Sequence, residues 1–299
     1  MTTTARRRAL MLVNPNARRG TAALEPVVAR LEAGGITVAI ERFSSPDEVS
    51  ADIIRRGAEF DLVIVCGGDG TLNSAARGVL ETGLPMGILP MGTANDLART
   101  LEISDNLLSA ADVIIAGKTR RVDLGEVNRH PFFNVASIGL SADLANSLTR
   151  EAKRRWGKLG YALAALKVLM RAKPFKATII SARGEEKVKT LQIAVGNGRH
   201  YGGGTVIEEN AAIDDGHLDL YSLEQDNVFK LMAMFGHFRR GTHGAWEEVR
   251  TDKSVEFDIR TKVPMPVNTD GDIVTYTPAH FLIRPAAIEV FAPVRAAAA

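Results

Sequence analysis

One stretch, residues 62–73, constrains the fold of this chain more than any other part of it. Its first half, Leu62-Val63-Ile64-Val65-Cys66, is a short apolar run rich in β-branched residues, which is typical of a fully buried strand. The run ends at Gly67-Gly68-Asp69-Gly70-Thr71, and from Leu72 the apolar residues recur at helical spacing. The stretch therefore predicts a strand, a glycine-rich turn and the start of a helix.

A glycine-rich turn between a strand and a helix favours the binding of an anion. Glycines let backbone N–H groups approach an oxyanion closely, and the helix dipole attracts negative charge. Asp69 lies inside this turn and would repel a bare phosphate, so we expect it to meet a bridging cation or a donated hydrogen bond. The alternative is a tight Asp-Gly turn that only joins the two elements. The preceding Gly67 and the buried strand favour the anion site.

A second glycine turn follows the next predicted strand. Gly92-Thr93-Ala94-Asn95-Asp96 comes directly after the apolar run that ends at Leu89-Pro90-Met91. Thr93 and Asp96 have the spacing of a capping box, which predicts a helix start. Two adjacent parallel strands that both end in glycine turns form one crevice at their carboxyl ends. The two turns together therefore predict a single ligand site.

The first part of the chain alternates between predicted strands and helices. Strands alternating with helices of about ten residues are typical of a parallel sheet flanked by helices. The predicted strands are 9–13, 36–40, 62–66 and 86–89, and the predicted helices are 22–33, 45–54, 71–80 and 107–116.

From about Arg121 the pattern changes to successive strands, and helical periodicity returns only at 141–170 and 228–238. Strands without helices between them indicate an antiparallel sandwich or barrel-like domain. We therefore predict an α/β domain over 1–123 and a β-rich domain over 124–299, with the C-terminal segment packing back on the first domain. The predicted strands are 122–127, 132–138, 177–182, 187–195, 217–223, 254–259 and 281–291.

Composition narrows the class of protein. The formal net charge of the 299 residues is only +2, which is too weak to indicate nucleic-acid binding. Cys66 is the single cysteine, so an internal disulfide framework is excluded and a reducing cytoplasm is expected. The longest helical apolar stretch, 159–170, contains Lys167 and falls short of the roughly 20 residues that span a bilayer. We expect a soluble cytoplasmic protein.

Basic residues flank this apolar stretch, between 150 and 158 and again between 167 and 176. They form either a solvated helix face or a surface that is attracted to anionic lipid. The second alternative would place the protein peripherally at the inner membrane surface.

Three motifs of the second half carry possible chemistry. Gly196-Asn197-Gly198 and Gly202-Gly203-Gly204 bracket a loop that is richer in glycine than a hairpin requires. Asp214-Asp215-Gly216-His217-Leu218-Asp219 is a turn with three acids, and a loop carboxylate surrounded by carbonyls commonly holds Mg²⁺ or Ca²⁺. Asp270-Gly271-Asp272 is either a functional motif or a type I′ hairpin turn.

Taken together, these motifs resemble the diacylglycerol kinase catalytic-domain family. The resemblance rests on residues 67–73 and 89–96, with Asn14-Pro15 and the motifs of the second half in the same order, and it covers nearly the whole chain. It is closest to the soluble bacterial lipid kinases of the YegS type. The resemblance implies an α/β nucleotide-binding domain with ATP in the interdomain cleft and a β-rich domain that takes the lipid.

The resemblance also implies the roles of individual residues. Asp272 would be the general base, with Asp270 beside it, and Asp69 would associate with the Mg²⁺ of the nucleotide. A separate Mg²⁺ or Ca²⁺ would be held by Asp215 and the carbonyls of Ala212 and His217. The ATP-binding residues implied are Gly67, Gly68, Asp69, Gly70, Thr71, Leu72, Asn73, Gly92, Thr93, Asn95 and Asp96.

The chain departs from the family pattern at two positions. Ser74 stands where the family usually has glutamate after the loop asparagine, and Asp272 stands where it usually has glutamate after Asp-Gly. The second departure shortens the expected catalytic carboxylate by one methylene.

The predicted function is transfer of the γ-phosphoryl group of ATP to a hydroxyl of a membrane lipid, either diacylglycerol or a phosphatidylglycerol-like lipid. A sphingoid-base kinase and an NAD kinase-like enzyme stay open as alternatives, as does a nucleotide- or lipid-sensing module without catalysis. The sequence leaves the oligomeric state open, a homodimer included.

Overall fold

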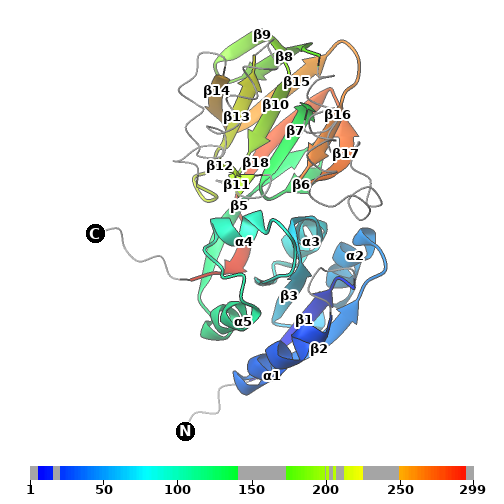
Figure 1. Ribbon diagram of the computed structural model, residues 1–299, viewed down its shortest axis with the longest axis vertical. Coiled ribbons are helices and arrows are strands. Elements are labelled where there is room, and N and C mark those ends of the chain that lie inside the picture. Colours follow the sequence, from blue (N-terminus) through cyan, green and yellow to red (C-terminus); the bar gives the residue numbers. More distant parts are fainter. Residues whose placement is uncertain are drawn as a thin grey trace, which may run out of the picture. The chain divides into compact units, whose positions relative to one another are not determined.

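The computed structural model describes residues 6–15, 21–140, 173–198, 200–201, 205–206, 212–224 and 249–293 (Figure 1). The chain forms two compact units. The first comprises Met1–Leu124, Gly202–Gly204 and Pro285–Ala299, and the second comprises Gly125–Tyr201 and Thr205–Arg284. The helical segments predicted at 141–170 and 228–238 lie outside the described residues.

The first unit contains a parallel sheet in the order β2-β1-β3-β4, as the alternation of strands and helices predicts. All residues of the two central strands, β3 and β4, are buried, which is typical of a parallel sheet covered on both faces. The end of β18 joins this sheet next to β4, where Val290 pairs with Met86 in parallel. The bounds are β1 (Arg7–Val13), β2 (Ile36–Arg42), β3 (Leu62–Gly67), β4 (Met86–Pro90) and β18 (Ala279–Phe291).

The helices of this unit form two pairs, because α1 packs against α5 and α2 packs against α3. Asn106 caps α5 by accepting hydrogen bonds from the N–H groups of Leu108 and Ser109, and Gly117 ends it in the left-handed conformation. The helical elements are η1 (Thr21–Leu24), α1 (Glu25–Ala33), α2 (Pro46–Arg56), η2 (Gly57–Glu59), α3 (Asp69–Thr82), α4 (Asp96–Thr100) and α5 (Leu107–Ala116).

The second unit is a sandwich of two antiparallel layers, which confirms the predicted β-rich domain. One layer is a six-stranded sheet in the order β14-β13-β10-β7-β16-β17, and the other contains β18, β15, β8 and β9. The bounds are β5 (Thr119–Val127), β6 (His130–Phe132), β7 (Val135–Gly139), β8 (Phe175–Ser181), β9 (Gly184–Thr190), β10 (Gln192–Gly196), β11 (His200–Tyr201), β12 (Thr205–Val206), β13 (Leu218–Leu223), β14 (Val249–Ser254), β15 (Glu256–Thr261), β16 (Pro266–Thr269) and β17 (Asp272–Tyr276).

Three segments that were predicted as single strands are each divided in two. The segment 187–195 contains the end of β9 and most of β10, and only Leu191 separates these strands, which lie in different layers. The segments 132–138 and 254–259 are divided in the same way. The apolar pattern continues through each corner because the strands on both sides face one shared core.

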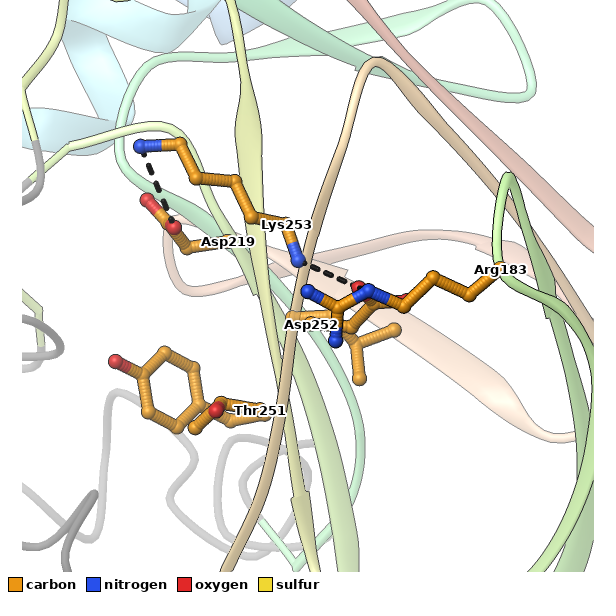
Figure 2. A pocket seen from close by; sticks show the side chains of 7 residues that line it. Arg183, Asp219, Thr251, Asp252 and Lys253 are labelled. Atoms are coloured by element: carbon orange, nitrogen blue, oxygen red, sulfur yellow. Dashed lines mark hydrogen bonds and ion pairs between the residues drawn. The ribbon is translucent and has the colours of Figure 1, made fainter.

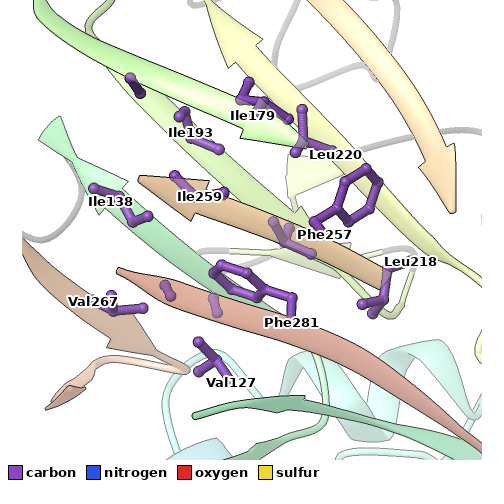
Figure 3. Packing of buried hydrophobic residues seen from close by; sticks show 14 of the residues in the cluster. Val127, Ile138, Ile179, Ile193, Leu218, Leu220, Phe257, Ile259, Val267 and Phe281 are labelled. Carbon is purple, nitrogen blue, oxygen red and sulfur yellow. The ribbon is translucent and has the colours of Figure 1, made fainter. Parts of the chain in front are cut away.

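That core fills the space between the two layers (Figure 3). Phe257 and Phe281 of one layer and Ile193 and Leu220 of the other are fully buried in it. Burial of large apolar side chains from both layers is the main force that holds a sandwich together. The other labelled members are Val127, Ile138, Ile179, Leu218, Ile259 and Val267.

In the part of the chain that the structure describes, no helix is both long and apolar enough to cross a membrane.

Cys66 provides a simple test of the first unit. Its thiol is fully buried in β3, and this burial raises the pKa of the thiol. Because the thiolate is the reactive form, we expect an aromatic disulfide reagent to label no thiol in the native protein and one thiol per chain in guanidinium chloride. Stoichiometric labelling of the native protein would contradict the buried position.

Candidate functional site

The first glycine turn has the predicted strand–turn–helix form. The Gly68 carbonyl accepts hydrogen bonds from the N–H groups of Thr71, at 2.9 Å, and Leu72, at 3.1 Å, so α3 begins directly at the turn. A Cβ atom at Gly67 would lie 2.4 Å from the Thr71 side chain. Asn14, which follows β1, donates from Nδ2 to Thr71 Oγ1 at 3.0 Å. The turn is thus fixed against the ends of two neighbouring strands.

The two glycine turns contact each other directly. Met91 N donates to the carbonyl of Gly67 at 2.9 Å. A Cβ atom at Gly68 would lie 2.9 Å from Cα of Gly92, and one at Gly92 would lie 2.5 Å from Cα of Gly68. Neither position can carry a side chain unless the two turns separate. The structure therefore brings the two sequence motifs together at the carboxyl ends of β3 and β4.

Asp69 joins the first turn to the helix of the second. Its Oδ1 accepts a hydrogen bond from the backbone N–H of Leu97 at 3.0 Å. From the sequence we expected Asp69 to meet either a bridging cation or a donated hydrogen bond, and the structure contains the hydrogen bond. Asp69 is half-buried, so its carboxylate also lies within reach of the surface where the turns meet.

The second turn is shaped by Asn95 rather than by Thr93. Asn95 is 4% exposed and left-handed, with φ of 52°, and it precedes α4. Its Oδ1 accepts from Gly92 N at 2.9 Å, and its Nδ2 donates to Asp105 at 2.9 Å. No side-chain cap is present at this helix start and Thr93 is exposed, so the predicted capping box is wrong. The left-handed asparagine turns the chain instead.

The remaining residues of the predicted nucleotide site differ in exposure. Gly70 and Asn73 are half-buried, whereas Leu72 and Asp96 are buried. Asn73 Oδ1 is shielded from solvent and accepts no hydrogen bond from the residues that the structure describes. Ser74 donates from Oγ to the carbonyl of Gly70 at 2.9 Å. The serine that replaces the usual family glutamate therefore bonds back to its own helix.

In the second unit, Asp270 and Gly271 form the two-residue turn between β16 and β17. Their φ values are 47° and 110°, which a type I′ hairpin turn requires. Of the two interpretations of this motif, the structure contains the hairpin turn. The Asp270 carboxylate accepts hydrogen bonds from the N–H groups of Phe133 at 3.0 Å, Asn134 at 3.3 Å and Val135 at 3.1 Å.

Asn197 binds the same segment from another strand end. Its Nδ2 donates to the carbonyl of Phe133 at 3.0 Å, and its backbone N–H donates to the carbonyl of Asn134 at 2.8 Å. The motifs 196–198 and 270–272, far apart in sequence, thus converge on residues 133–135. Sequence reasoning missed Phe133 and Asn134, because they lie inside what reads as one continuous strand.

Asp272 has a different environment from Asp270. It is exposed at the first position of β17, and it makes no hydrogen bond or ion pair with any residue that the structure describes. Since Asp270 is occupied by three backbone amides, Asp272 is the acid of this motif whose carboxylate is open to a ligand.

The loop predicted to hold a metal contains an ion pair. Asp215 Oδ2 lies 2.7 Å from Nζ of Lys253, and Asp215 Oδ1 accepts from His217 N at 3.0 Å. Among the described residues, no three His, Cys, Asp or Glu side chains gather as a metal site would require. The ligand role of Ala212, Asp215 and His217 stays a prediction.

Lys253 also pairs with Asp219, at 3.9 Å, beside a cavity of about 290 Å³ (Figure 2). The other charged residues of the lining, Arg183 and Asp252, form an ion pair of 3.1 Å with each other. Lys253 is thus shared between Asp215 and Asp219 at one edge of this cavity. Its lining is Arg183, Asp219, Leu220, Tyr221, Thr251, Asp252 and Lys253.

Gly202-Gly203-Gly204 lies outside the described residues, as do most of the basic residues between 150 and 176.

Comparison with known proteins places this geometry in a family. Residues 8–127 match the family model of the diacylglycerol kinase catalytic domain, and residues 134–292 match that of the YegS C-terminal NAD kinase beta sandwich-like domain. A diacylglycerol kinase of Mycobacterium tuberculosis is 33% identical and covers 94% of each chain. A diacylglycerol kinase of Staphylococcus saprophyticus is 28% identical over 96% of each chain.

Solved structures agree with the sequence comparison. A crystal structure of a diacylglycerol kinase from Bacillus anthracis superimposes with a TM-score of 0.81 at 26% identity, covering 98% of this chain and 99% of that one. The fold, both domain matches and the two glycine turns all agree with this family. The chain therefore belongs to the diacylglycerol kinase catalytic-domain family of lipid kinases.

Proposed function

We propose that this protein transfers the γ-phosphoryl group of ATP to the free hydroxyl of diacylglycerol. The observation that carries the proposal is the contact between the turns at Gly68 and Gly92. It creates a surface of backbone and helix N-terminus at the ends of two parallel strands, which suits a polyphosphate. The relatives named diacylglycerol kinase support diacylglycerol as the acceptor.

Phosphoryl transfer depends on positioning and on neutralising charge more than on covalent chemistry. In this proposal the residues of 67–73 and 92–96 hold the nucleotide. Mg²⁺ enters with ATP and neutralises phosphate charge, and carboxylate oxygen is the ligand type it prefers. Asp69 is the half-buried acid at this surface and would hold the ion.

The acceptor hydroxyl needs a base that can take its proton. Asp272 fits this role because it is exposed and has no partner among the described residues. Asp270 is a positioning residue, since its carboxylate holds the amides of residues 133–135. The substrate is a membrane lipid, so we propose that the reaction takes place at a membrane surface.

The proposal is tested by incubating the protein with labelled ATP and extracted membrane lipids. Labelled phosphatidic acid supports it. Labelled phosphosphingoid base or NADP would assign the chain to a different acceptor, and nucleotide binding without product would indicate a sensing module.

We expect Asp69→Asn to abolish phosphoryl transfer. The amide retains an oxygen for the N–H of Leu97, so the turns should stay together, but the negative charge is lost. Initial rates and thermal melting check this. Activity within a few-fold of wild type, at an unchanged melting temperature, would remove Asp69 from the mechanism.

The acids of the hairpin should respond differently to substitution. Asp272→Asn should lose nearly all turnover at unchanged melting temperature and ATP affinity, because an amide cannot take a proton. Asp272→Glu should retain measurable activity, although a displacement of about 1 Å can cost on the order of 100-fold in rate.

Asp270→Asn serves as the comparison. It should lower both turnover and melting temperature, because three backbone amides lose a charged acceptor. Near-normal turnover of Asp272→Asn beside a normally stable but inactive Asp270→Asn would make Asp270 the base.

Chelation tests the Asp215 loop in the absence of nucleotide. If Asp215 holds a structural ion, as proposed from the sequence, a chelator should lower the melting temperature of the wild type but barely affect Asp215→Ala. Equal chelator sensitivity in both proteins would argue against the ion and leave the ion pair with Lys253 as the role of Asp215.

A further inference from the structure

Asp105 binds the residue that shapes the second glycine turn. Its Oδ1 accepts a hydrogen bond from Asn95 Nδ2 at 2.9 Å. Asn95 is 4% exposed, and its Oδ1 accepts from Gly92 N at 2.9 Å. Two successive hydrogen bonds thus join Asp105, which lies outside both glycine motifs, to the glycine that contacts Gly68.

The carboxylate of Asp105 decides which way the Asn95 amide points. An amide side chain has an oxygen acceptor and a nitrogen donor of similar shape, so a rotation can exchange the two. An ionised carboxylate can only accept, and a backbone N–H can only donate. Asp105 on one side and Gly92 N on the other therefore favour the same single orientation. In the opposite orientation, Nδ2 of Asn95 would face the N–H of Gly92, and two donors would meet.

The residues on both sides of Asp105 are fixed within the first unit. Asn106 follows it and caps α5 with its side chain. The N–H of Asn106 donates to Ser104 Oγ at 3.1 Å. Two residues before Asp105, Ile103 is buried and donates its N–H to the Ala98 carbonyl at 2.8 Å. The carboxylate of Asp105 therefore has a defined place from which to hold the turn.

Two contacts at the candidate nucleotide surface depend on the shape of this turn. Gly92 lies so close to Gly68 that a Cβ atom on either residue would collide with the backbone of the other. Leu97, two residues after Asn95, donates its N–H to Asp69 at 3.0 Å. A change in the orientation of Asn95 would therefore disturb both the backbone surface and the acid that would hold Mg²⁺.

We propose that Asp105 is a positioning residue for ATP, an inference that rests on the proposed function. It acts through Asn95 and does not touch the nucleotide. Its contribution is the hydrogen-bond acceptor and not the negative charge, because a negative charge near the site would repel the phosphates of ATP. Loss of the acceptor weakens the binding of ATP and leaves the binding of the lipid unchanged, since the turn belongs to the nucleotide site.

The test compares two substitutions of this residue. Asp105→Ala removes both the acceptor and the charge, whereas Asp105→Asn removes the charge and keeps an oxygen for Asn95 Nδ2. We expect Asp105→Ala to raise KM for ATP about fivefold, the equivalent of one hydrogen bond, with kcat and KM for diacylglycerol unchanged. Asp105→Asn should restore KM for ATP to near the wild-type value.

Asp112→Ala is the matched control, because it also removes one acid from the first unit. Asp112 lies on α5 and forms an ion pair with Arg30 of α1 at 2.7 Å. Its loss should leave both KM values unchanged. The inference is overturned if Asp105→Asn raises KM for ATP as much as Asp105→Ala does, because the charge would then be what matters. It is also overturned if Asp105→Ala leaves KM for ATP unchanged, whatever its melting temperature, or raises both KM values equally.

Failure of the proposed function is recognised separately, because the wild type would then bind ATP without phosphorylating lipid. Calorimetric titration with ATP and Mg²⁺ in the absence of lipid tests Asp105 in that case. A Kd that rises in Asp105→Ala and not in Asp105→Asn supports the inference, and equal Kd values in the three proteins overturn it. A wild type that binds no ATP would overturn the nucleotide site and this inference with it.

Discussion

The close approach of two backbone segments, at Gly68 and Gly92, is the constraint on which the first unit's candidate site depends. A side chain at either position would collide with the opposite turn. The contact lets the Gly67 carbonyl accept from Met91 and lets Asp69 accept from Leu97. Both bonds would be lost if the turns separated. Gly68 and Gly92 are therefore required because the two backbones lie too close for a side chain, and not because of unusual backbone angles.

In the second unit, side chains rather than a backbone contact hold distant segments together. Residues 133 and 134 form a short break between β6 and β7, and Val135 begins β7. The Asp270 carboxylate accepts hydrogen bonds from the N–H groups of residues 133–135, and Asn197 donates to the carbonyls of Phe133 and Asn134. Because the backbone of a buried break must be hydrogen-bonded, two residues from distant strand ends are fixed in place. This need also distinguishes two acids that only Gly271 separates, since the turn directs Asp270 to the break and leaves Asp272 exposed.

The Asp215 loop has a contact that its own sequence does not reveal. Three acids in six residues predict a cation. In the fold, strand β14 pairs with β13 so that Lys253 lies opposite Asp219 and within 2.7 Å of Asp215. An ammonium group from a strand more than thirty residues later in the chain therefore lies at this loop. No local motif contains that information.

By itself, the sequence determined the elements that depend on local patterns. The alternation of strands and helices in the first unit, both glycine turns and the β-rich character of the second unit all follow from periodicity and glycine placement. Periodicity records which faces are buried, and strands that turn a corner around one core, such as β9 and β10, keep the same periodicity. The sequence therefore could not locate these corners.

Only the tertiary structure decided which polar groups have partners. Asn95 rather than Thr93 shapes the second turn, and Asp270 is occupied while Asp272 makes no hydrogen bond with any described residue. The physical reason is that a hydrogen bond depends on distance in space. The donors that satisfy Asp270 lie about 135 residues away in the chain, where no sequence pattern relates them.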